Sequence, residues 1–246
     1  MVDARLAALS LELRDQVFLG CCDIAGAGVV ALTSLCLANG LEPIPVDLED
    51  GNAGGAVFDV AGRNGTEKGL PEVMLFNSEK ASFIIINTVP SKSNRAVFVA
   101  SLLKYISSNA SESFKSQGCL TIVGALRIRQ KMATEGPYSF CLKNDTAKPK
   151  FLNGFESLPD NLPIHNSTLA MLLHFCVARG IQTCGLIVPG FKPSSTSPAL
   201  LHSEGVADLI AALRKAVDLT ASQPVDLQAR VSWLEEQENS DTLMYC

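Results

Sequence analysis

Two glycines with the spacing of a dinucleotide fingerprint are the first residues of this sequence whose pattern suggests chemistry. Gly26, Gly28 and Ala31 match G-x-G-x-x-G/A, between an apolar strand-like run and a helix-like run. Such glycines bring the backbone close to a pyrophosphate at a helix N-terminus, and an acid about 20 residues later holds the ribose. Asp47 occupies that later position. The pattern fits a Rossmann-like nucleotide- or NAD-binding enzyme that uses Gly26-Ala27-Gly28 and Asp47.

A packing interpretation accounts for the same glycines. Asp23 interrupts the approach from the strand, and the most strand-like residues already end at Gly20 to Cys22. A dinucleotide fingerprint runs from its strand straight into the first glycine. Short motifs also match often by accident. We therefore favour small residues that let a helix pack tightly on a sheet, and we keep the nucleotide-binding enzyme as the alternative.

The spacing of cysteines and histidines does not predict a metal site or a catalytic centre. Cys21 and Cys22 are adjacent and have no partners at the spacing of zinc ligands. His165 and His174 fall on a predicted loop and a predicted helix, and no G-x-S-x-G elbow marks a serine nucleophile. From these patterns we expect neither a cofactor nor a metal, and they mark no catalytic residue.

The C-terminal residues form the second pattern with chemical meaning. Leu243-Met244-Tyr245-Cys246 follow an acidic helix-like segment and the small polar residues 239–242. A tyrosine ring offers contact area at little entropic cost, and a lysine or backbone N–H groups can hold a terminal carboxylate. Undocked termini are usually polar, which this one is not. Met244, Tyr245 and Cys246 therefore either are captured by a partner or fold back onto the domain.

Composition excludes several classes of partner. Apolar residues are 47% and charged residues 18% of the 246, which is a globular composition. A net charge of −5 without clustered Lys and Arg argues against nucleic-acid binding. We find no signal-peptide pattern and no apolar run of the roughly 18 residues that span a bilayer. The eight scattered cysteines are typical of reduced core thiols, so we expect a protein of the cytosol or nucleus.

Strand-like and helix-like segments alternate along most of the chain. This alternation predicts an α/β fold, a three-layer α/β/α sandwich with a mostly parallel sheet. The predicted strands cover 16–22, 42–47, 73–76, 82–89, 119–124, 138–142 and 181–188. The predicted helices cover 29–37, 94–107, 169–179 and 206–217, with Asn39-Gly40, Asn166 or Ser167, Gly180 and Ser203 at their ends.

The remaining segments define the predicted domain organisation. Six glycines in 51–69 predict a loop with a short strand at 56–60, and Pro224 begins a last amphipathic helix. No internal repeat or linker divides the chain. We therefore expect one α/β/α domain over 1–220, followed by a short C-terminal helix and a free tail over 221–246.

Three parts of the sequence, taken in order, carry a family resemblance. They are 17–20 with the helix 29–40, then 162–165 with the following helix and the strand 181–188, and last the ending Met244-Tyr245-Cys246. Together they resemble the proteasome assembly chaperone family, specifically its chaperone 1 type, whose members end in an apolar-Tyr-X motif. Residues 50–160 match that family only in the order of their elements, and the glycine-rich 51–69 departs from it.

The resemblance implies binding rather than catalysis. It implies an α/β/α domain that pairs with a second assembly chaperone, of the chaperone 2 type, and a heterodimer that sits on the α-ring of the 20S proteasome. The tail then inserts between adjacent α subunits, with the Cys246 carboxylate on a pocket lysine, the Tyr245 ring buried and Met244 as apolar anchor. Neither nucleic acid nor a membrane is an expected partner.

Overall fold

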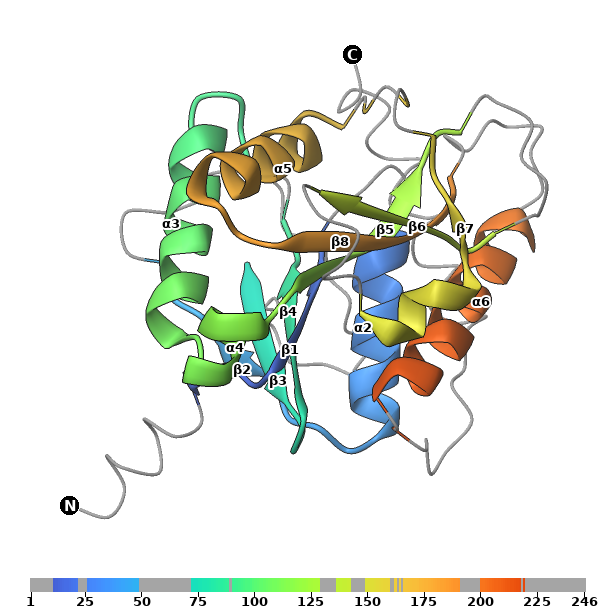
Figure 1. The fold of residues 1–246 in the computed structure, drawn as a ribbon, viewed down its shortest axis with the longest axis horizontal. Coiled ribbons are helices and arrows are strands. Elements are labelled where there is room, and N and C mark those ends of the chain that lie inside the picture. Colours follow the sequence, from blue (N-terminus) through green and yellow to red (C-terminus); the bar gives the residue numbers. More distant parts are fainter. Residues whose placement is uncertain are drawn as a thin grey trace, which may run out of the picture.

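The structure is a computed structural model in which one sheet of eight described strands lies between two layers of helices (Figure 1). The strand order is β2-β3-β4-β1-β5-β8-β6-β7. In the helix over residues 200–217, the side chains are described from residue 205 onward. The structure describes residues 11–21, 26–48, 72–88, 90–128, 136–142, 149–159, 162, 164, 166–190, 200–217 and 219.

The elements alternate along the chain as predicted. The strands are β1 (Gln16–Gly20), β2 (Ile44–Pro45), β3 (Val73–Asn77), β4 (Ala81–Ile86), β5 (Leu120–Leu126), β6 (Tyr138–Leu142), β7 (Glu156–Ser157) and β8 (Thr183–Pro189). The helices are α2 (Ala27–Ala38), α3 (Arg95–Asn109), α4 (Glu112–Gln117), the 3₁₀ turn η2 (Lys150–Gly154), α5 (Ser167–Arg179) and α6 (Leu200–Val217). No described helix is both long enough and apolar enough to cross a membrane.

The four central strands of the sheet are parallel, and the strand on each side of them, β3 or β6, pairs antiparallel with its central neighbour. Strands β4, β1, β5 and β8 run parallel to one another, and all six residues of β4 are buried. Strands covered on both faces are expected to be apolar throughout, which explains these runs. Strand β3 is antiparallel to β4 because a tight turn joins them, in which the Ser78 N–H donates to the Ala81 carbonyl at 2.8 Å. The predicted α/β fold is confirmed, with a more mixed sheet at its flanks.

Each face of the sheet has its own core, as strand alternation requires. Val17 and Leu19 of β1 pack on the side of α3 and α5, whereas Phe18 packs on the side of α2 and α6. In Figure 1, α3 and α5 lie to one side of the sheet, and α2 and α6 lie to the other. The predicted three-layer sandwich follows from these two cores.

Most predicted helix ends are confirmed. The Asn166 side chain accepts a hydrogen bond from the Leu169 N–H at 2.9 Å, and Gly180 ends the same helix with a φ of 72°. Asn39 caps α2, and Gly40 follows with a φ of 70°. The prediction for Ser203 is wrong because α6 begins three residues earlier, at Leu200, where leucines already favour a helix.

Some predictions fall outside the described residues. They are the loop 51–69 with its strand at 56–60, the helix from Pro224, and the separate C-terminal unit 221–246. Helix α4 and strand β7 were not predicted. Both are very short, with six and two residues, so neither gives a periodic pattern that the sequence could reveal.

Helix α2 touches the sheet backbone to backbone. A Cβ added at Gly28 would lie 2.0 Å from the carbonyl oxygen of Val123 in β5. A Cβ at Gly20 in β1 would lie 2.8 Å from the Gly28 carbonyl oxygen. Both contacts meet main-chain atoms, which cannot rotate away as a side chain can. Glycine at both positions therefore sets how closely α2 approaches the two central strands.

The side-chain hydroxyl of Tyr105 in α3 is buried. The ring packs against the core on the α3 and α5 side, and the hydroxyl has no hydrogen-bond partner. Burial raises the pKa of Tyr105 from 10.0 to about 12, because the phenolate is poorly solvated there. Tyr105 is therefore a probe of this core that titrates at alkaline pH.

The Gly28→Ala substitution is expected to destabilise the fold. Because the Val123 carbonyl is fixed by its strand, the overpacked methyl group should cost about 1–3 kcal/mol or more of unfolding free energy. Urea unfolding followed by circular dichroism measures this loss. Gly154→Ala is the matched control, since a Cβ there meets nothing within 4 Å. Equal urea midpoints for both variants would contradict the close approach of α2.

Tyr105→Phe tests the buried hydroxyl by its pH dependence. The raised folded-state pKa means that the stabilising neutral form is fully populated below about pH 10 and is lost as pH rises toward about 12. The wild-type protein should therefore lose roughly 2 kcal/mol more stability than Tyr105→Phe between these pH values. Parallel urea titrations at several pH values provide the measurement. Identical pH profiles would show that the hydroxyl is solvated.

Candidate functional site

The N-terminus of α2 is the first candidate site, and the structure uses it for packing. Gly26 is the N-cap with a left-handed φ of 62°, and Ala27 and Gly28 open the helix at the carboxyl end of β1. The close approach that Gly28 permits is made to the Val123 carbonyl of β5. A strand oxygen therefore occupies the space that the second fingerprint glycine leaves for a pyrophosphate. The packing interpretation explains the glycine spacing.

Asp47 does not meet these glycines. It is exposed and follows β2, and the strands β3 and β4 separate β2 from β1. Three strand spacings correspond to about 14 Å. In a dinucleotide fold the acid follows the strand next to the first one. The structure therefore lacks the arrangement of Gly26, Gly28 and Asp47 that the nucleotide alternative requires.

Asn87 is a buried polar residue at the same edge of the sheet, and sequence reasoning missed it. Its backbone N–H donates to the Glu72 carbonyl at 2.8 Å, which continues the pairing of β3 with β4. Its side chain is fully buried, and both amide atoms lack a hydrogen-bond partner. By alternation it shares the face of Phe83 and Ile85, which α2 covers. Leaving such a group unpaired costs about 1–3 kcal/mol of folding free energy. The packing at the end of β4 does not explain why a polar side chain is buried there.

A groove of about 440 Å³ lies at the opposite, amino edge of the sheet. It lies where α3, α4 and α5 end. Apolar side chains line part of it, among them Ile106, Phe114 and Ile181, and Lys115 and Arg179 add positive charge. None of its described lining residues is His, Cys, Asp or Glu. This composition suits binding, and it offers no acid–base pair.

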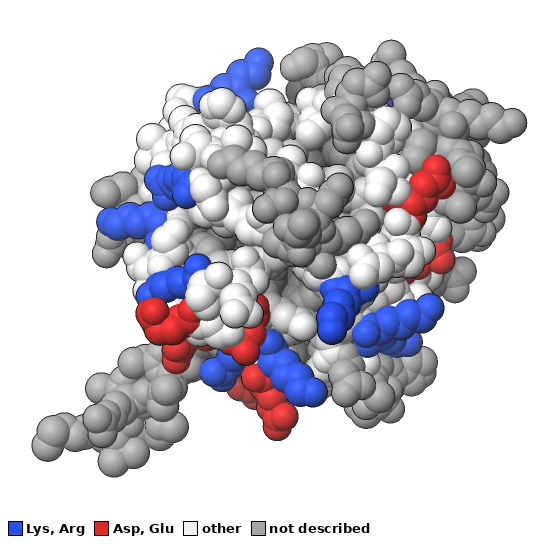
Figure 2. Space-filling view, viewed as in Figure 1, with Lys and Arg blue, Asp and Glu red and all other residues white. Residues whose placement is uncertain are grey.

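Charges of both signs lie beside this groove. Figure 2 shows basic and acidic side chains next to one another around α4, without a continuous field of one sign. The Glu112 carboxylate and the Lys115 ammonium pair at 2.7 Å, with 90% and 47% of their side chains exposed. Such exposed pairs contribute little stability. The surface around the groove is therefore mixed in charge, unlike a nucleic-acid footprint.

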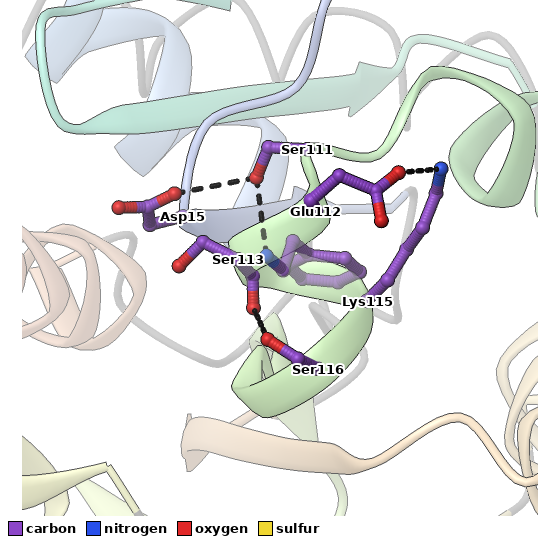
Figure 3. Close-up of polar contacts among 7 residues, drawn as sticks. Asp15, Ser111, Glu112, Ser113, Lys115 and Ser116 are labelled. Carbon is purple, nitrogen blue, oxygen red and sulfur yellow. Dashed lines mark hydrogen bonds and ion pairs between the residues drawn. The ribbon is translucent and has the colours of Figure 1, made fainter.

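Polar contacts fix the wall of the groove that α4 forms (Figure 3). The Ser111 hydroxyl accepts a hydrogen bond from the Phe114 N–H at 3.1 Å and donates one to the Asp15 carboxylate at 3.2 Å. The Ser116 hydroxyl donates to the Ser113 carbonyl at 3.0 Å. Asp15 directly precedes β1, so these contacts tie α4 to the central strand. The Ser111–Asp15 contact thus connects the start of α4 to the residue before β1.

The other predicted site residues can be placed only in part. Met244, Tyr245 and Cys246 lie outside the described residues, so their role stays a prediction. His174 is exposed on α5, and it is not part of the core. Within the part of the chain that the structure describes, no group of three or more His, Cys, Asp and Glu side chains could hold a metal ion.

This chain is similar to solved proteins in structure, although comparison of its sequence gives no match. No protein-family model matches the chain, and no curated protein matches it by sequence. A Thermoplasma acidophilum protein of unknown function aligns at a TM-score of 0.65 and 17% identity, over 99% of this chain and 93% of that one.

Two structures from Pyrococcus furiosus carry functional descriptions. PbaA, an archaeal homolog of proteasome-assembly chaperone, aligns at a TM-score of 0.61 and 13% identity, over 95% of this chain and 93% of its own. PbaB, an archaeal proteasome activator, aligns at a TM-score of 0.59 and 14% identity, over 93% and 92%. The chain thus has the α/β fold of proteasome assembly chaperone homologues.

Proposed function

We propose that this chain is an assembly chaperone for the 20S proteasome and acts by binding rather than by catalysis. The observation that carries the proposal is the match of nearly the whole chain to the fold of PbaA, which is described as a homolog of proteasome-assembly chaperone. The description of PbaB as a proteasome activator supports a proteasome partner. The apolar-Tyr-X ending adds an independent sequence feature that suits capture by a proteasome subunit.

The finer proposal concerns how the chaperone binds. We propose a chaperone of the chaperone 1 type that pairs with a second assembly chaperone of the chaperone 2 type, in the cytoplasm and the nucleus. The heterodimer sits on the proteasome α-ring, and the tail inserts between adjacent α subunits. The Cys246 carboxylate contacts a lysine, while Tyr245 and Met244 fill an apolar pocket.

The tail and the domain surface have to act together. One charge-assisted contact and one buried ring supply a few kcal/mol, roughly the range of a millimolar to micromolar complex. A second, linked contact converts the tail's binding into an intramolecular step, which raises the overall affinity. The small polar residues 239–242 supply the reach for this linkage. Loss of the tail should therefore weaken the complex without unfolding the domain.

Capture of proteasome α subunits from cell extract tests the proposal. The chain is co-expressed with its stable partner, and the bound α subunits are quantified by mass spectrometry. The intact tail should retain α subunits, whereas removal of Met244-Tyr245-Cys246 should reduce their recovery at least tenfold, as loss of about 1.4 kcal/mol or more predicts. Two milder variants locate the effect: Tyr245→Ala removes the ring, and one glycine added after Cys246 displaces the carboxylate.

The outcomes distinguish the proposed chaperone function from the proposed role of the tail in binding. Tyr105→Phe, which lies far from the tail in sequence, is the matched control and should capture α subunits normally. Equal capture by the full and truncated chains would retain the chaperone and remove the tail from its mechanism. Failure of every variant to capture α subunits, with circular dichroism showing folded protein, would overturn the proposed function.

Nucleotide binding provides the opposite test. Because Gly28 meets the Val123 carbonyl and Asp47 lies three strands from β1, NAD⁺ should give no saturable heat in isothermal titration calorimetry. The Asp47→Asn variant is the control, since this exposed carboxylate can change without disturbing the core. Saturable NAD⁺ binding that weakens in Asp47→Asn would contradict the packing interpretation and restore the enzyme alternative.

A further inference from the structure

Two cysteines face each other across neighbouring strands of the sheet. Strand β6 runs antiparallel to β8, and Cys141 lies directly opposite Cys184 in their register. Their sulfur atoms are in direct contact, 2.8 Å apart, and either thiol could donate a hydrogen bond to the other. Opposite residues of antiparallel strands have Cα atoms about 4.5–5.5 Å apart, within the range that a disulfide spans. A bond between these sulfurs needs no change of strand pairing.

The two thiols differ in their access to solvent. Cys184 is fully buried in the core on the α2 and α6 side. Cys141 is half-buried and packs against that core from its edge. A reagent in solution therefore reaches Cys141 first, and Cys184 is the neighbour that can complete the reaction from inside. This division into an accessible and a resolving thiol is typical of cysteines that are reversibly oxidised.

The other described cysteines do not share this arrangement. Cys36 of α2 and Cys176 of α5 lie on helices and are buried, and burial raises the pKa of both thiols. Cys119 is partly exposed, and its sulfur donates to the Leu120 carbonyl at 3.8 Å. Of the six cysteines within the described residues, only Cys141 and Cys184 are register partners on adjacent strands.

We propose that Cys141 and Cys184 form a reversible modification site, a cross-strand disulfide made by exchange with oxidised glutathione. The Cys141 thiolate attacks one glutathione sulfur, forms a mixed disulfide and releases the other glutathione as a thiolate. The Cys184 thiolate then attacks the Cys141 sulfur and releases the second glutathione. The two protein thiol protons end on the two glutathione thiols, the protein loses two electrons, and one glutathione disulfide is reduced.

The bond would tie an edge of the sheet to its centre. Strand β8 belongs to the parallel centre, whereas β6 and β7 form the flank beyond it. The two cysteines are 43 positions apart in the chain, so the disulfide closes a long loop and restricts the unfolded chain. We expect the oxidised protein to resist unfolding of this flank. This site does not depend on proteasome binding.

Peptide mapping tests the site directly. The reduced full chain is incubated with oxidised glutathione, alkylated and digested with trypsin, which separates Cys119, Cys141 and Cys184 onto different peptides because Lys and Arg lie between them. The expected product has lost two hydrogens, carries a cross-link between the Cys141 and Cys184 peptides, and reverts with dithiothreitol. Its thermal midpoint should rise by roughly 5 °C or more.

Three variants make the result decisive. Cys119→Ser is the matched control and should form the cross-link as the wild type does. Cys184→Ser should stop at a glutathione adduct on Cys141, and Cys141→Ser should leave Cys184 unmodified in the folded protein. The proposal is overturned if the wild-type chain keeps a stable adduct on Cys141, stays unmodified under all conditions, or cross-links through Cys119.

Discussion

The contact between α2 and the carbonyl of Val123 is the constraint on which the rest of the fold depends. Strands β1 and β5 can be covered on the α2 side only if this helix approaches to backbone distance, and Gly20 and Gly28 allow that approach. The close approach brings the apolar residues of α2 onto Phe18 and Val123. The opposite face is covered by α3 and α5. With both faces buried, the central strands can be apolar throughout.

Two polar features of the described residues lie at opposite edges of the sheet. Asn87 lies at the carboxyl edge, and the groove beside α4 lies at the amino edge. The described residues that line the groove include no Asp, Glu or His. Met244, Tyr245 and Cys246 lie outside the described residues, so recognition through the tail rests on the sequence and stays a proposal.

Local sequence patterns predicted the elements well, but such patterns do not determine strand order or register. Asn166 caps the start of α5 and Gly180 its end, as expected, because a cap depends on the hydrogen bonds and φ of a single residue. Gly26 and Gly28 stayed ambiguous, since glycine spacing is the same whether the nearby oxygen belongs to a strand or to a phosphate. The facing of Cys141 and Cys184 was beyond prediction, because register is set by distant residues. The unpaired amide of Asn87 likewise depends on the strands and helix around it.

The order of the strands has a consequence for how the protein is made. The central strand β1 is synthesised before its neighbours, and its partners come much later in the chain: Gln16 pairs with Ala81, and Val17 pairs with Leu120. At about 5–20 residues per second, a ribosome needs several seconds to add those partners. The apolar β1 must wait unpaired through that interval, and such long-range parallel pairing is slow. A protein proposed to assist assembly therefore passes through a stage of its own synthesis in which its central strand can make unwanted contacts.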